Sequence, residues 1–113
     1  MINIAGLRTK GGMNSREHWR KRAKRVRMER DSVLLHTYGL ASPALPVRVR
    51  LTRIAPSNGL DDDNLASALK SVRDQIAAWI GVDDKHRDIV RYVYEQERGP
   101  WGVRIEILPM VTE

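Results

Sequence analysis

The apolar residues between positions 65 and 80 recur at the spacing of a helix that buries one face, and this is the strongest periodic pattern in the chain. They follow an i, i+4, i+7, i+11 rhythm, and Gly81 comes next, where a helix C-terminus favours glycine. The pattern predicts a helix that ends at about Ile80 and packs on a core. Its apolar positions are Leu65, Leu69, Val72, Ile76, Trp79 and Ile80.

Residues 47–54 alternate apolar and polar side chains, which predicts a strand with one buried face. Residues 89–96 and 103–108 are two further strand candidates, and the glycine-rich turn 98–102 between them predicts a hairpin. Residues 2–7 alternate weakly and predict a short edge strand. On the first of these strands we expect Val47, Val49 and Leu51 to face the core and Arg48, Arg50 and Thr52 to face the other way.

A second helical pattern lies near the N-terminus. Asn14 is a candidate N-cap and Glu17 follows three positions later, as in a capping box. We expect this helix to run to about His36, with a basic face opposite its apolar one. The apolar face is predicted to carry Trp19, Ala23, Val26, Val33 and Leu34, and the basic face Lys21, Lys24 and Arg25.

The predicted order is strand, helix, strand, helix, strand, strand, which indicates a single α+β domain over residues 1–113 with a small mixed sheet and two main helices. A length of 113 residues fits one domain, and 42% hydrophobic with 30% charged residues is a globular composition. The chain has no Cys, and its apolar runs are a few residues long. We therefore expect a reducing compartment such as the cytoplasm and no membrane span.

The charge is concentrated between residues 8 and 30, where ten Lys or Arg oppose two Glu. This segment has a net charge of +8. Because the whole chain has a net charge of +6, the remaining residues together carry −2. A concentrated basic segment on a near-neutral body is typical of proteins that bind nucleic acid. The alternatives are a solvated helix face and an anionic membrane surface, and the second is disfavoured because the apolar side of this helix is needed for a core.

An acidic cluster stands at the start of the predicted helix that ends at about Ile80. Asp61, Asp62 and Asp63 are adjacent, and Asp83 and Asp84 follow the far end of the helix. In an extended approach Asp61 and Asp63 lie on one side of the chain, and two converging carboxylates suit a hard cation such as Mg²⁺. The alternative interpretation is structural: Asp63 caps the helix and the other carboxylates are solvated.

A polar stripe runs opposite the apolar face of this helix, through Asp63, Ser67, Lys70 and Asp74. Helical side chains lean toward the N-terminus, so Lys70 is expected to point back toward the acidic cluster. There its ammonium group is placed to contact a phosphate held by the metal. The alternative is that Lys70 simply pairs with carboxylates on the helix surface.

The run Leu60-Asp61-Asp62-Asp63-Asn64-Leu65, followed by an amphipathic helix and then Gly81-Val82-Asp83-Asp84, resembles the pattern of RusA-type Holliday junction resolvases, which are common in phages and prophages. The pattern is D-x-D-N-L, roughly twenty helical residues, then D-D. Its strong part covers roughly a quarter of the chain, from Asp61 to about Val90. The Arg-rich strand before it and the aromatic-basic helix that contains Trp19 are similar too.

The resemblance implies a homodimeric, Mg²⁺-dependent (or Mn²⁺-dependent) endonuclease that cuts four-way DNA junctions in two opposed strands, in the cytosol of a bacterium or of a phage-infected host. Carried over by position, Asp61, Asp63 and Asp84 are the metal-binding catalytic acids, and Asn64 belongs to the motif without an assigned role. The chain has Ser67 where the family pattern often has a functional Lys. Lys70, one turn later on the same face, is the candidate to replace it.

The expected DNA-binding residues are the basic ones that would hold backbone phosphates and so recognise junction shape without reading bases. Three alternatives stay open: a non-catalytic DNA-binding phage protein, a nuclease for other branched DNA, and a protein whose basic helix binds an acidic partner. Trp101 and Tyr38 are candidates for a dimer surface. The expected phosphate contacts are Arg16, Arg20, Lys21, Lys24, Arg25, Arg48 and Arg50.

Overall fold

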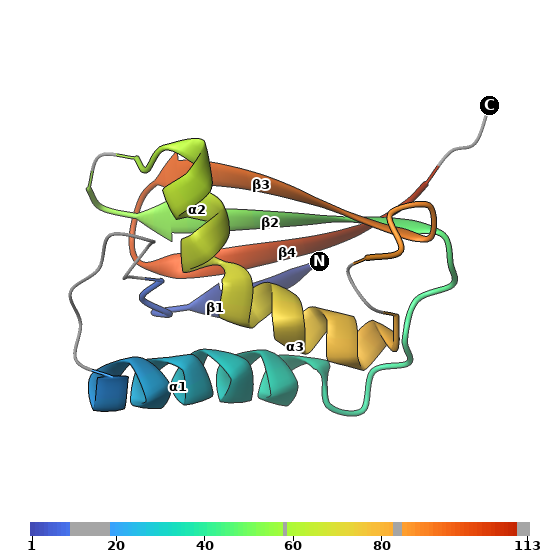
Figure 1. Ribbon diagram of the computed structural model, residues 1–113, viewed down its shortest axis with the longest axis horizontal. Coiled ribbons are helices and arrows are strands. Elements are labelled where there is room, and N and C mark those ends of the chain that lie inside the picture. The colour runs from blue at the N-terminus through green and yellow to red at the C-terminus, as the bar shows by residue number, and fades with distance from the viewer. Residues whose placement is uncertain (10–18, 58, 83–84, 111–113) are drawn as a thin grey trace.

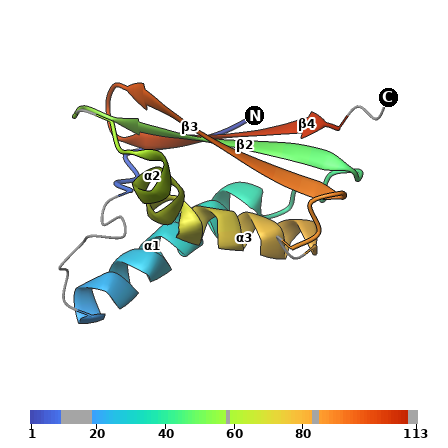
Figure 2. The same cartoon turned by 45° about the horizontal axis from the view of Figure 1, so that its top comes forward.

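The computed structural model describes residues 1–9, 19–57, 59–82 and 85–110, and in them a four-stranded mixed sheet carries its helices on one face (Figures 1 and 2). The α+β class is confirmed, and so is the order of elements, except that two helices replace the single one predicted between the second and third strands. The predicted cap at Asn14 and Glu17 lies outside the described residues. The elements are β1 (Ile2–Ala5), α1 (Trp19–Thr37), β2 (Val47–Ala55), α2 (Asp62–Ala68), α3 (Lys70–Ile80), β3 (Val90–Arg98) and β4 (Gly102–Pro109).

The strand order in the sheet is β1-β4-β2-β3, so β3 is an edge strand. β2 and β3 are parallel, with Val47 opposite Val90, and α2 and α3 form the crossover that parallel neighbours require. The predicted hairpin of the last two strands is wrong, because β2 lies between β3 and β4 and pairs with both. The turn passes the end of β2, where the Gly99 amide donates to the Ala55 carbonyl at 3.0 Å.

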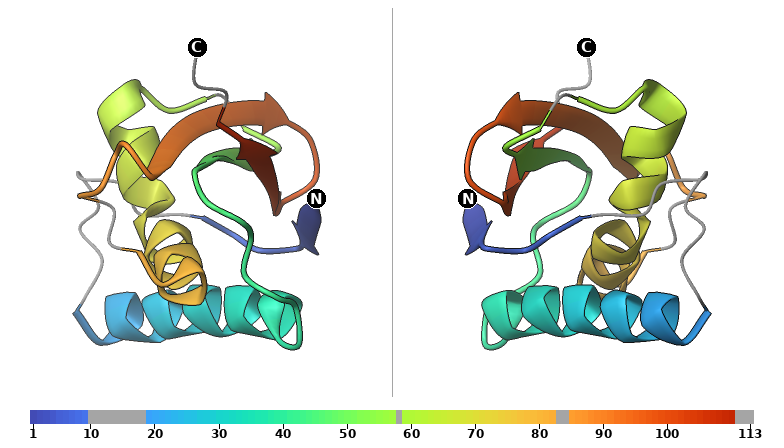
Figure 3. Two further views of the ribbon diagram at one scale, coloured as in Figure 1. Left: turned by 90° about the vertical axis from the view of Figure 1, so that its right-hand side faces the viewer. Right: turned by 90° about the vertical axis from the view of Figure 1, so that its left-hand side faces the viewer.

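The core lies between the sheet and its helices. Val47, Val49 and Leu51 of β2 are buried, as their alternation predicts, and they share one cluster with Val72 and Ile76 of α3. The end-on views show α3 between α1 and the β3 side of the sheet (Figure 3). The face of the sheet away from the helices carries the alternate positions of β2, among them Arg48 and Arg50.

The helix predicted to end at about Ile80 is divided into two, α2 and α3, at Leu69. Leu69 has φ −97° and ψ 3°, and its side chain is fully buried in the core. The change of direction lets α2 pack beside β3 while α3 packs on α1 (Figure 1). The C-terminal end is as predicted, since Gly81 adopts φ 83° and its amide donates to the Ala77 carbonyl at 2.8 Å.

The buried face of α1 differs from the predicted one. Val33 is fully buried and Val26 is half-buried, but Glu29 and Thr37 complete this face. The carboxylate of Glu29 can be buried because the Arg25 guanidinium lies 3.1 Å away, one turn earlier. Three residues predicted for the apolar face are instead exposed: Trp19, Ala23 and Leu34.

Candidate metal and nucleic-acid site

Asp61 is the N-cap of α2. One of its carboxylate oxygens accepts the Asn64 main-chain amide at 2.9 Å, and the other accepts the Asn64 side-chain amide at 3.1 Å. Asp61 therefore caps the helix, where the structural alternative had assigned Asp63. Asn64, which had no role in the sequence pattern, fixes the orientation of the Asp61 carboxylate.

Asp62 and Asp63 form the first turn of α2 and are exposed. The expectation of an extended run from Asp61 to Asp63 is wrong, because helical geometry begins at Asp62. The three carboxylates instead share one helix N-terminus, where free amides and the helix dipole stabilise negative charge. The resulting site is an exposed, multiply anionic turn.

The segment that leads into this turn is held by Gln96 of β3. The Leu60 amide donates to Oε1 of Gln96 at 2.8 Å, and Nε2 of Gln96 donates to the Leu60 carbonyl at 2.7 Å. A Cβ at Gly59 would lie 2.9 Å from the Gln96 side chain, so glycine permits this approach. We call this pair of hydrogen bonds the Gln96–Leu60 clamp. No sequence pattern indicated it.

A cavity of about 270 Å³ lies beside the clamp. Arg53, which is 5% exposed, contributes a buried cation to its lining. Its Nε donates to the Thr9 carbonyl at 3.1 Å, its guanidinium lies 5.3 Å from the centre of the Trp101 ring, and burial lowers its pKa. The lining residues are Arg53, Ser57, Gly59, Gln96, Glu97 and Arg98.

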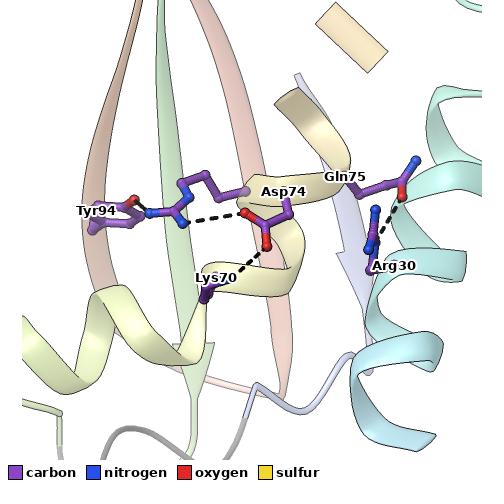
Figure 4. Close-up of polar contacts among 6 residues, drawn as sticks. Arg30, Lys70, Asp74, Gln75 and Tyr94 are labelled. Carbon is purple, nitrogen blue, oxygen red and sulfur yellow. Dashed lines mark hydrogen bonds and ion pairs between the residues drawn. The ribbon is translucent and has the colours of Figure 1, made fainter. Parts of the chain in front are cut away.

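Lys70 pairs with Asp74 rather than with the acidic turn. Its Nζ lies 2.9 Å from Oδ2 of Asp74, one turn further along α3 (Figure 4). Asp74 also accepts from Arg73, and Arg73 donates to the Tyr94 hydroxyl at 3.2 Å. The expectation that Lys70 points back toward the acidic turn is therefore wrong, and the alternative of a surface pair holds. Ser67 lies in α2 and is half-buried.

The third expected metal ligand, Asp84, lies outside the described residues, as does Asp83. Among the residues that are described, no group of three or more His, Cys, Asp or Glu side chains is placed to hold a metal ion. Asp61 and Asp63 nevertheless offer the donor type that Mg²⁺ prefers, carboxylate oxygen. Each Asp61 oxygen keeps a second lone pair beside its bond to Asn64, so the cap does not prevent metal binding.

The expected phosphate contacts on α1 divide into two kinds. Lys21 and Lys24 are exposed, and Arg20 is exposed with its guanidinium 5.1 Å from the centre of the Trp19 ring. Arg25 is instead held by the buried Glu29 and stabilises the fold. Arg16 lies outside the described residues.

The two expected contacts on β2 lie on the face of the sheet away from the helices. Arg48 is exposed there, whereas Arg50 lies 3.7 Å from Glu95 and 3.5 Å from Glu106. Two carboxylates already neutralise Arg50, so it is a poor phosphate contact. The structure thus separates Arg48 and Arg50 from the basic residues of α1, which lie on the helical side.

Of the two candidates for a dimer surface, Trp101 is half-buried beside Arg53, so it is not a free surface residue. Tyr38 is 84% exposed, and Leu35 and Leu40 beside it in the chain are 76% and 52% exposed.

Within the described ranges, no helix has the length and apolar character needed to cross a membrane.

Comparison with known proteins finds one similar sequence of undefined role. An uncharacterized protein of Xylella fastidiosa (strain Temecula1) is 36% identical over an alignment of 83 residues, which covers 64% of this chain and 52% of that protein. The chain thus spans about half the length of this relative. No protein-family model matches the chain, and no solved structure matches it.

Proposed function

We propose that this protein is a Mg²⁺-dependent, structure-specific endonuclease that resolves four-way DNA junctions. The observation that carries the proposal is an exposed acidic turn with hydrogen bonds on both sides of its first residue. Gln96 holds Leu60 from one side, Asn64 holds both oxygens of Asp61 from the other, and Asp63 stays exposed. An oriented Asp61 carboxylate beside an exposed Asp63 suits metal binding, whereas a purely structural cap needs neither the second Asn64 contact nor the clamp.

In this proposal Asp61, Asp63 and Asp84 hold the cation, with Asp83 beside Asp84. The bound metal would polarise the scissile phosphate and activate a water molecule for its hydrolysis. In the same proposal, Arg53 is the residue that we assign to a phosphate oxygen entering the cavity beside the Gln96–Leu60 clamp. Lys21 and Lys24 then hold phosphates farther along the DNA on the helical side.

A homodimer belongs to the same proposal, since two-fold symmetry matches the symmetry of a four-way junction. The exposed apolar side chains at the C-terminal end of α1 and in the following loop are the surface we assign to it: Leu34, Leu35, Tyr38 and Leu40. A dimer by light scattering that becomes a monomer in Leu35→Asp supports this surface; an unchanged mass in this variant would exclude it.

Metal titration tests the proposal directly, with calorimetry or Mn²⁺ relaxation as the readout. We expect divalent binding by the unmodified protein and by Asp62→Asn, and its loss in Asp61→Asn and Asp63→Asn. Asp62→Asn is a matched control, because it removes the same charge from the same turn. Equal binding by all three variants, or none by the unmodified protein, favours the non-catalytic DNA-binding alternative.

The substrate class needs a separate comparison. Four-way junctions, flaps and forks of equal length distinguish a junction resolvase from a nuclease for other branched DNA. A DNA affinity that hardly falls with salt would instead favour an acidic protein partner, because phosphate contacts make affinity fall steeply with salt.

A further inference from the structure

A second cavity, of about 410 Å³, lies between α3 and the edge strand β3. No acidic residue is among the described residues that line it, and half of those residues are arginines. Its walls come from α3, from the loop before β3 and from β3 itself. The lining residues are Arg73, Arg87, Val90, Arg91, Tyr92 and Tyr94.

One of the three guanidinium groups is held by neighbouring side chains, and the other two are exposed. Arg73 gives one nitrogen to Asp74 at 3.3 Å and another to the Tyr94 hydroxyl at 3.2 Å, so it is held in place at the cavity wall. Arg87 and Arg91 are exposed, and neither has an acidic partner among the residues that the structure describes.

Arg91 adds a second reason to expect an anion here. It stands in register with Arg48 on the neighbouring strand β2, so two like charges lie directly across a strand pair. Like charges in this relationship destabilise a sheet unless something neutralises them. Arg91 shares the face of Arg48, away from the helices, and reaches the rim of the cavity at the edge strand β3. A phosphate bound to Arg91 there would offset part of the repulsion.

We propose that this cavity is a phosphate-binding site for the DNA backbone. Planar guanidinium groups bind phosphate oxygens through paired hydrogen bonds, and tyrosine hydroxyls are suitable additional donors. The identity of the ligand as DNA rests on the proposed function, whereas the affinity for phosphate rests on the cavity alone.

The position of the cavity along β3 fits this role. Tyr92, Tyr94 and Gln96 alternate along one face of the strand, so the cavity and the Gln96–Leu60 clamp share that face. Gln96 lies four positions after Tyr92 in the strand, a length of roughly 13 Å. A DNA strand carries one phosphate for about every 3.4 Å of duplex axis, so a strand at the acidic turn reaches the cavity within about four phosphates.

Inorganic phosphate tests the cavity without DNA. In a nuclear magnetic resonance titration at constant ionic strength, we expect saturable shifts of the amides around Arg73, Arg87 and Arg91 at millimolar phosphate, with none when chloride replaces it. Arg87→Gln should abolish these shifts, and Arg104→Gln should not. Arg104 is the matched control because its guanidinium is already bound by Glu97 through two contacts of 2.8 Å.

A DNA titration in EDTA tests the ligand. For a four-way junction we expect Arg87→Gln to weaken binding by roughly threefold to tenfold and to reduce the salt slope by about 1, with Arg104→Gln unchanged. If phosphate shifts the amides around the cavity but the protein binds no DNA, the phosphate site is supported and the proposed function is wrong. If the protein binds DNA, Arg87→Gln leaves the salt slope of binding unchanged and phosphate shifts no amides at the cavity, the phosphate site is wrong. The nuclease proposal then still stands.

Discussion

Both carboxylate oxygens of Asp61 are bound by a single residue, Asn64, through its main-chain amide at 2.9 Å and its side-chain amide at 3.1 Å. This arrangement gives the D-x-D-N-L run a physical basis. A main-chain cap needs only one of these bonds, and the second requires a side-chain donor at position 64. Asn64 thus orients a carboxylate that remains exposed to solvent.

Asn64→Ala removes the side-chain contact and leaves the main-chain cap. We expect the free energy of unfolding to fall by about 1 kcal/mol or less, because the lost hydrogen bond is exposed. Metal affinity should fall more clearly, since the Asp61 carboxylate loses one of its two fixed contacts. Asn64→Asp should weaken metal-free stability further, because it places a like charge against Asp61. Calorimetric metal titration and chemical denaturation measure both effects; unaltered metal affinity in Asn64→Ala would contradict the assigned role.

Gln96→Ala breaks the Gln96–Leu60 clamp, and Gly59→Ala should do the same by displacing the Gln96 side chain. Each change should cost about 1 kcal/mol of stability and lower the rate of junction cleavage. Because both act on one contact, the double variant should be no worse than either single variant, which a double-mutant cycle measures. Strictly additive losses would mean that the two residues act independently.

Ser67→Lys places a lysine four residues after Asp63 in α2, within reach of the acidic turn. We expect it to raise the cleavage rate by about tenfold, because a nearby cation stabilises the charge that develops on the phosphate. Lys70→Ala should reduce the rate much less than Asp63→Asn does, since Asp74 already holds the Lys70 ammonium. A complete loss of cleavage in Lys70→Ala would show that Lys70 leaves Asp74 to serve the reaction.

The Glu97–Arg104 pair on the open face of the sheet makes stability depend on pH. Hydrogen bonds from Arg104 hold the pKa of Glu97 below its ordinary value of 4.5. A lowered pKa in the folded state means that the pair stabilises the protein above pH 4.5 and that this contribution is lost as the pH falls below that value. Glu97→Gln should therefore be less stable than the unmodified protein at pH 7, with the difference vanishing in acid and shrinking in high salt. A difference that persists at pH 2 would have another origin.

The sequence predicted most of the fold because its periodic segments are local signals. Val72 and Ile76 mark the buried face of α3, and the alternation from Val47 to Leu51 marks the buried face of β2. The hairpin prediction failed because strand order depends on contacts between distant segments, and β2 takes the place beside both later strands.

The candidate site was predictable in its acidic residues but not in its supporting contacts. Gln96 contacts Leu60 across 36 positions of the chain, and no local pattern indicates such a pair. The buried Glu29 had a detectable signal, since Arg25 lies four residues before it, yet a charged residue is not ordinarily assigned to a core. The direction of Lys70 was predicted from the lean of side chains in a continuous helix, whereas the helix breaks at Leu69 and the Asp74 carboxylate lies 2.9 Å from the Lys70 ammonium.

The most direct test of the central claim is cleavage of a synthetic four-way junction in Mg²⁺, with linear duplex as the reference substrate. The unmodified protein and the charge-matched Asp62→Asn variant should introduce paired nicks in opposed strands of the junction alone, and Asp63→Asn should introduce none. Absence of nicks from the unmodified protein despite tight junction binding, or equal nicking by Asp63→Asn, would contradict the assignment of a metal-dependent junction endonuclease.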